Sequence, residues 1–216
     1  MKHILACVMA SAMALNASAW DSSAMVFAAA GDSKVVVPDS TGFKFKDIKL
    51  VKTTPVRDQN QSGTCWCFST NTFFEDEIMR KGGDELDLSE MYVVRMCYLD
   101  KARKYVRMDG KINFSQGGAA HDVPYVMARY GAMPEEAYPG LNYGEEKHAH
   151  AELSKVLQSY LDAVLSSGSK RLSTAWEKGF EAILDSYFGP LPETFEYKGK
   201  TYTPRSFAES LGIDTD

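Results

Sequence analysis

The sequence has no apolar run long enough to cross a bilayer and no long run of basic residues. Its longest apolar stretch, residues 4–15, is interrupted only by Ser11 and falls short of the roughly 20 residues that a membrane helix needs. Lysine and arginine are interspersed with aspartate and glutamate, and the formal net charge is −5. We therefore expect no membrane span and no nucleic-acid partner.

Cysteine and histidine are also scarce, with four of each among 216 residues. The cysteines lack the paired spacing of zinc sites, which argues against a metal site built on them. His148 and His150 stand two residues apart, and on a helix that spacing directs them to different faces. We expect these two and His121 to be surface or helix-capping residues, and we expect the protein to use no metal or organic cofactor.

The first nineteen residues have the composition of a secretory signal peptide. A short polar start precedes the apolar run, and residues 17–19 (Ala-Ser-Ala) supply a small-x-small cleavage site, with a second such site ending at Ala30. We expect export to the periplasm or the cell exterior, with residues 20–41 as a mobile linker. Three cysteines remain after cleavage, and this odd number leaves at least one thiol unpaired or paired between chains.

Hydrophobic periodicity and turn residues divide the rest of the chain into mostly helical segments. Alternation predicts a strand over residues 43–51, and a loop rich in Pro, Asp, Asn, Ser and Gly follows. Helices are expected from Thr64 or Cys65 to Lys81, from Ser89 onward, and over residues 119–130 despite Pro124.

The longest helical tract, residues 145–188, is expected to form two helices divided at residues 166–169. Its apolar residues recur at helical spacing, which indicates a packed core or a docked helical hairpin rather than a cofactor site. Residues 195–202 predict a short β-hairpin around a Lys-Gly-Lys turn. Thr203-Pro204 then predicts the start of a last short helix ending at Gly212.

One stretch, residues 55–69, carries the clearest chemical signal. Cys65 stands where a loop becomes a helix, and a helix N-terminus favours the thiolate form that acts as a nucleophile. Gly63 allows the chain to turn tightly just before it. Attack on a carbonyl creates an oxyanion, which the Cys65 backbone N–H and the side-chain amide of Gln59 are placed to stabilise. We therefore interpret Cys65 as a catalytic nucleophile and Gln59 as an oxyanion donor.

The same stretch resembles the active-site signature of papain-like cysteine peptidases. That signature has a glutamine, a cysteine six residues later, a tryptophan beside it and an aromatic two further on; here these are Gln59, Cys65, Trp66 and Phe68. The likeness continues at three later segments: Leu86–Glu90, Gln116-Gly117-Gly118, and Tyr130–Pro139. The resemblance implies that Gly117 and Gly118 form a wall of the substrate cleft, and that Gly63 and Trp66 also contribute to substrate binding.

A narrower resemblance points to the bleomycin hydrolase and aminopeptidase C branch of these peptidases. It rests on residues 114–119, the long helical tract, and residues 192–195 and 202–207. It implies an α+β papain-like domain over residues 42–216, consisting mostly of the helical lobe with a helical insertion at about 145–188 and with the second, β lobe largely missing. Members of this branch are often oligomeric, so the resemblance also suggests a homo-oligomer. The implied activity is aminopeptidase-like hydrolysis of peptide substrates.

The catalytic base is the point at which this sequence departs from the pattern. In the family a histidine takes the thiol proton and an asparagine orients that histidine. None of the four histidines matches the family position. We therefore expect this chain to be the N-terminal half of a peptidase: a truncated product, a fragment, or one chain of a processed pair whose partner is the missing C-terminal half.

Two other functions remain open at this point. The chain is alternatively an inactive remnant that at most binds peptides in a half-formed cleft. It is otherwise a thiol oxidoreductase that uses Cys65 and Cys67, although two residues along a helix turn the second thiol about 200° away. Cys67 and Cys97 are expected to be buried core residues.

Overall fold

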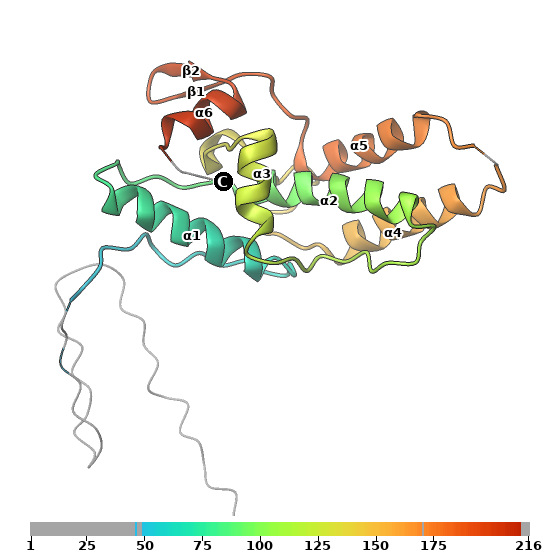
Figure 1. The fold of residues 1–216 in the computed structure, drawn as a ribbon, viewed down its shortest axis with the longest axis horizontal. Helices are drawn as coiled ribbons and strands as arrows, with labels where there is room; N and C mark the ends of the chain where they lie inside the picture. Colours follow the sequence, from blue (N-terminus) through green and yellow to red (C-terminus); the bar gives the residue numbers. More distant parts are fainter. Residues whose placement is uncertain (1–45, 47–48, 170, 213–216) are drawn as a thin grey trace, which may run out of the picture. The chain divides into compact units, whose positions relative to one another are not determined.

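The part of the chain that the structure describes is mostly helical (Figure 1). A computed structural model describes Lys46 and residues 49–169 and 171–212, all within a unit that spans Phe45–Asp216. Its elements are α1 (Cys65–Arg80), α2 (Glu90–Arg107), α3 (Asp122–Tyr130), the 3₁₀ helix η1 (Glu135–Ala137), α4 (Ala151–Leu165), α5 (Ala175–Phe188), β1 (Phe195–Tyr197), β2 (Lys200–Tyr202) and α6 (Pro204–Ser210).

Two sequence predictions fall on other parts of the chain. The signal peptide and the linker at residues 20–41 lie outside the described residues. Most of the strand expected over residues 43–51 does too, and the described residues 49–51 have no strand geometry. Among the described residues, no helix is both long and apolar enough to cross a membrane.

Helix α2 lies at the centre of the core and is buried on every side over its first ten residues. Met91, Tyr92, Val93 and Val94 follow one another and are each at most 2% exposed. Helices α1, α3, α4 and α5 all contact α2 (Figure 1). A helix enclosed in this way is largely apolar on every side and shows no single apolar stripe.

Capping groups set the helix boundaries where the sequence expected them. The Ser89 hydroxyl accepts the backbone N–H of Tyr92 at 3.0 Å and starts α2. Thr203 and Ser206 form a reciprocal capping box at the start of α6. Helix α1 ends at Arg80, with Lys81, the predicted end, as its C-cap residue. These predictions are confirmed.

The long helical tract forms a docked hairpin of two helices, as predicted. Leu153, Leu157 and Leu161 of α4 are fully buried, as are Phe180 and Leu184 of α5. Helix α4 begins at residue 151 rather than at residue 145. The preceding residues run instead beside the loop that leads into α1, where Gln61 and Ala149 form a parallel bridge.

The only sheet among the described residues is the β1–β2 hairpin. Its strands pair antiparallel, with Phe195 opposite Tyr202. Lys198 and Gly199 both have positive φ, 47° and 74°, as a two-residue type I′ turn requires. The hairpin packs on Phe207 of α6. The described residues thus combine helices with one small β element, in agreement with the predicted α+β class.

We predict that Leu157→Ala lowers the free energy of unfolding by about 2–5 kcal/mol, because it leaves a cavity between α4 and the rest of the core. Val156→Ala, at the adjacent and 36% exposed position, is the matched control and is expected to cost less than about 1 kcal/mol. Urea unfolding followed by circular dichroism measures both. Equal losses would contradict the docking of α4 through Leu157.

Candidate active site

Cys65 is the first residue of α1 and its thiol is free and exposed. The turn before it is closed by its own side chains. Ser62 Oγ donates to the carbonyl of Gln59 at 2.8 Å and lies 2.5 Å from Thr64 Oγ1. Thr64, the N-cap residue, makes no side-chain bond to the helix. A helix N-terminus without such a cap leaves backbone N–H groups free, as oxyanion binding requires.

Gln59 belongs to the same turn, and its side-chain amide is engaged there. Its Nε2 donates to the carbonyl oxygen of Ser62. Gln59 is therefore held within the turn that presents Cys65, but its donor is directed at the backbone. Its assignment as an oxyanion donor stays a prediction.

A second segment, far along the chain, anchors the nucleophile turn from outside. The backbone N–H of Gln61 donates to the carbonyl of His148 at 2.9 Å, and the N–H of His150 donates to the carbonyl of Gln61 at 3.1 Å. These paired bonds form the bridge between Gln61 and Ala149. The segment that enters α4 thus fixes the loop that enters α1.

The two glycines of the predicted cleft wall differ in how much space surrounds them. A Cβ on Gly118 would lie 2.6 Å from Cε2 of Trp66 and 2.9 Å from a carboxylate oxygen of Asp122. The indole of Trp66, only 8% exposed, occupies that space. A Cβ on Gly117 would find nothing closer than 3.8 Å. Gly118 is required by the tryptophan beneath it, whereas Gly117 borders open space.

Gln116, to which the sequence assigned no role of its own, connects this wall to the nucleophile turn. Its Oε1 accepts the backbone N–H of Gly63 at 2.7 Å, and its carbonyl accepts the indole N–H of Trp66 at 3.1 Å. The only sequence signal for it was its place beside the glycine pair. The structure thus brings the segments of Gly63, Trp66 and Gly118 together; their part in substrate binding stays a prediction.

The histidines are placed differently from one another. His121 is exposed and stands at the N-cap position of α3, as predicted. His148 and His150 are buried, at 7% and 0% exposure, so a surface position is wrong for both. His150 does stand at the N-cap position of α4, although its side chain makes no capping bond. Burial lowers the pKa of His150 to about 4, with a contribution from His148. Both precede α4 and their rings touch each other, because the bridge to Gln61 draws this segment inward.

The remaining described cysteines are core residues, as predicted. Cys67 is fully buried and its thiol donates to the carbonyl of Glu90 at 3.6 Å. Burial raises the pKa of Cys67 well above its usual value and that of Cys97 to about 12. Both are free thiols that stay protonated near neutral pH. An exchange partner for Cys65 would need a thiolate that reaches it, and Cys67 meets neither condition.

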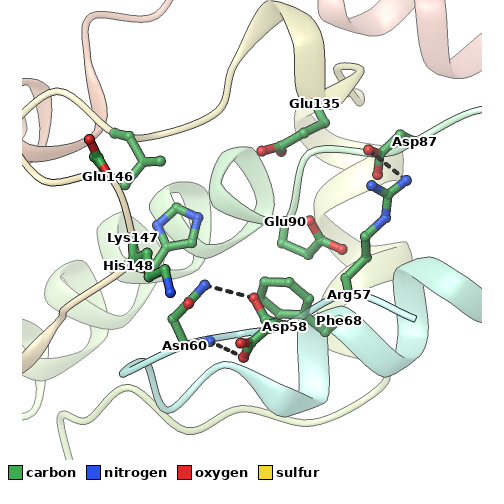
Figure 2. Close-up of a pocket in the computed structure, with 11 residues that line it drawn as sticks. Arg57, Asp58, Asn60, Phe68, Asp87, Glu90, Glu135, Glu146, Lys147 and His148 are labelled. Carbon is green, nitrogen blue, oxygen red and sulfur yellow. Dashed lines mark hydrogen bonds and ion pairs between the residues drawn. The ribbon is translucent and has the colours of Figure 1, made fainter. Parts of the chain in front are cut away.

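An acidic pocket of about 200 Å³ lies between the loop before α1 and the starts of α2 and η1 (Figure 2). Arg57 pairs with Asp87 across 2.7 Å. Glu90 is only 4% exposed. Burial, reinforced by neighbouring carboxylates, raises the pKa of Glu90 to about 9 and that of Glu135 to about 7. Among the described residues, no three His, Cys, Asp or Glu side chains are placed so that together they could hold a metal ion.

Comparison with known proteins places this geometry in a family. A family model described as papain family cysteine protease matches residues 39–202, well over half of the chain. The chain belongs to the papain family of cysteine proteases. The helical lobe with its small hairpin is therefore the helical part of a papain-like fold, as the resemblance implied.

Several curated papain-family proteins are similar to this chain over part of their length. Digestive cysteine proteinase 2 of Homarus americanus is 35% identical over 144 residues, which cover 66% of this chain and 39% of that protein. Human cathepsin L2 is 34% identical over 86 residues, covering 40% of this chain and 23% of the relative. Aminopeptidase C of Lactococcus lactis subsp. lactis is 25% identical over 198 residues, covering 74% and 44%. The chain thus spans less than half of each of these relatives.

We predict that Gly118→Ala lowers the free energy of unfolding by about 1–3 kcal/mol, because the added methyl group displaces the indole of Trp66. Gly117→Ala is the matched control, and it is expected to leave stability nearly unchanged because its Cβ meets no atom closer than 3.8 Å. Urea unfolding midpoints measure both. A stable Gly118→Ala variant would contradict the packing of Trp66 under the glycine.

We also predict that Glu90 contributes a part of the stability that is lost as the pH rises from about 5 to 9. Glu90 ionises in the unfolded chain near its usual pKa of 4.5 but stays protonated in the fold up to about 9, so the unfolded state binds fewer protons across this range. Glu90→Gln should match the parent at pH 4 and be more stable at pH 8 by at least about 1 kcal/mol. Parallel pH profiles of the two proteins, measured by urea unfolding, would refute this.

Proposed function

We propose that this chain carries the nucleophile and oxyanion parts of a cysteine peptidase. The observation that carries the proposal is the free, exposed thiol of Cys65 at the first residue of a helix whose N-cap makes no side-chain bond. Family membership supports the reaction class. The chemistry is acyl transfer from a peptide to Cys65, followed by hydrolysis of the thioester.

The roles of the other residues follow from that reaction. As the sulfur attacks, a C–S bond forms and the carbonyl π electrons move to the oxygen. The Cys65 backbone N–H and the Gln59 amide stabilise this oxyanion. Because Gln59 donates to Ser62 in the structure, it exchanges that partner for the oxyanion during the reaction. Gly63, Trp66, Gly117 and Gly118 border the substrate.

The proton acceptor is the missing part of this chemistry. Among the described residues no hydrogen bond joins a histidine ring to the Cys65 thiol, and His148 and His150 are enclosed in the core. We infer that a histidine and an asparagine from another polypeptide segment complete the site. By itself, this chain then hydrolyses peptides slowly or not at all.

The proposal also covers the kind of substrate and the location of the protein. The likeness to aminopeptidase C, over 198 residues, supports an aminopeptidase-like enzyme acting on peptides. The homo-oligomer rests on the sequence resemblance to that branch alone. The residues that resemble a signal peptide support export from the cytoplasm. An inactive remnant that only binds peptides is the alternative. The oxidoreductase reading loses its support because Cys67 is buried and protonated.

We predict that iodoacetamide at neutral pH alkylates Cys65 of the folded chain at least about tenfold faster than Cys67 or Cys97, because only Cys65 is exposed. Peptide mass mapping identifies the modified residues, and a Cys7→Ser background removes the remaining thiol. Cys65→Ser is the control in which rapid labelling disappears. In 6 M urea all three cysteines should react alike.

Two results would contradict the proposal. A Cys65–Cys67 disulfide that forms reversibly in a glutathione redox titration would favour the oxidoreductase. Slow alkylation of Cys65 in the folded chain would leave no accessible nucleophile. Peptide turnover by the purified chain at an ordinary protease rate would instead show that the base lies within it.

A further inference from the structure

Gln116 joins the nucleophile turn, the glycine wall and the segment entering α4. Its Oε1 accepts the N–H of Gly63 at 2.7 Å, its backbone carbonyl accepts the indole N–H of Trp66 at 3.1 Å, and its Nε2 donates to the carbonyl of His150 at 3.4 Å. The contact with Gly63 joins residues 53 positions apart in the sequence.

The fit between Gln116 and Gly63 is close. A Cβ on Gly63 would lie 3.0 Å from Cβ of Gln116 and 3.3 Å from its Oε1. A side chain at residue 63 would therefore push the glutamine away from the turn. The glycine before the nucleophile is needed here for the approach of Gln116 as well as for the turn itself.

The loop that carries Gln116 is itself held in place. Lys101 of α2 donates to the carbonyl of Ser115 at 3.2 Å and to that of Gly117. Its ammonium group also lies 5.6 Å from the centre of the Trp66 ring, within range of a cation–π interaction. Gln116 thus projects from a backbone fixed on both sides toward a turn whose N-cap, Thr64, gives the helix no side-chain bond.

We propose that Gln116 is a positioning residue for the peptidase chemistry proposed above. By accepting the Gly63 N–H, it fixes the peptide planes that lead into Cys65 and hence the direction of the Cys65 N–H that faces the oxyanion. Its second bond, to His150, connects the segment that enters α4 to the same turn. This inference rests on the proposed function, because only an oxyanion makes the direction of that N–H matter.

An amide side chain of this length is suited to the task. Glutamine offers an acceptor to Gly63 and a donor to His150 at once. Glutamate keeps the acceptor for the Gly63 N–H but loses the donor to His150. Methionine has a similar size and shape but offers neither. Comparing these two substitutions therefore separates the bond to Gly63 from the bond to His150.

The test uses the full chain with Cys7→Ser and compares Gln116→Met, Gln116→Glu and the control Gln158→Met. Gln158 lies on α4 and donates to the hydroxyl of Tyr105 on α2 and to the carboxylate of Asp162 on α4. The first readout is solvent exchange of the Gly63 N–H by NMR. The second is the affinity of acetyl-alanyl-glycinal labelled with ¹³C at the aldehyde. The Cys65 sulfur bonds to that carbon, and the thiol proton passes to the former carbonyl oxygen.

We expect Gln116→Met to speed Gly63 exchange and to weaken aldehyde binding, each by about tenfold, as the loss of one hydrogen bond predicts. Alkylation of Cys65 by iodoacetamide, which forms no oxyanion, should stay within about twofold. Gln116→Glu, assayed at 0.5 M salt to screen its charge, should stay within about threefold of the parent in both readouts. Gln158→Met should change neither.

Each other outcome overturns the inference. Unchanged Gly63 exchange in Gln116→Met shows that the glutamine does not hold the turn. Faster exchange with unchanged aldehyde affinity, or with an equal loss of iodoacetamide reactivity, shows a merely structural role. Failure of the parent chain to bind the aldehyde overturns the proposed function itself, and this inference with it.

Discussion

Backbone hydrogen bonds from distant segments hold the turn that presents Cys65. A loop cannot hold a nucleophile in place unless its own N–H and C=O groups are satisfied. Here the N–H and the C=O of Gln61 are both hydrogen-bonded to the backbone of residues 148–150. The N–H of Gly63 is hydrogen-bonded to the side chain of Gln116. These partners add to the bonds that the side chains of Gln59 and Ser62 make within the turn, whereas Thr64 adds no side-chain cap to α1. The backbone N–H groups at the start of the helix then stay free, as the proposed binding of an oxyanion requires.

The core explains why those partners stay in place. Helix α2 is enclosed by α1, α3, α4 and α5, and its Lys101 reaches the loop of Gln116. Helix α4 docks through a row of leucines and carries residues 148–150 at its start. The helical insertion thus contributes structure to the active-site turn. It is packed against the same central helix as α1 and is not a separate appendage on the lobe.

Local signals predicted much of this, and tertiary contacts account for what they missed. The helix start at Cys65, the Ser89 cap and the Lys-Gly turn each depend on a few neighbouring residues, so the sequence reveals them. His148 and His150 were expected at the surface or as helix caps, because a short polar segment gives no sign that the loop of Gln61 pairs with it. Gln116 was missed for the same reason: its partner is 53 residues away. The enclosure of α2 likewise depends on four other helices.

The contact between Trp66 and Gly118 also constrains how this lobe can change over evolutionary time. While the indole occupies its place, every side chain larger than hydrogen at residue 118 collides with it. A smaller residue at position 66 would remove that collision but would leave a void and an unpaired carbonyl on Gln116. The two positions are therefore epistatic. Replacing either one first lowers the stability of the lobe, so we expect the two residues to be inherited together.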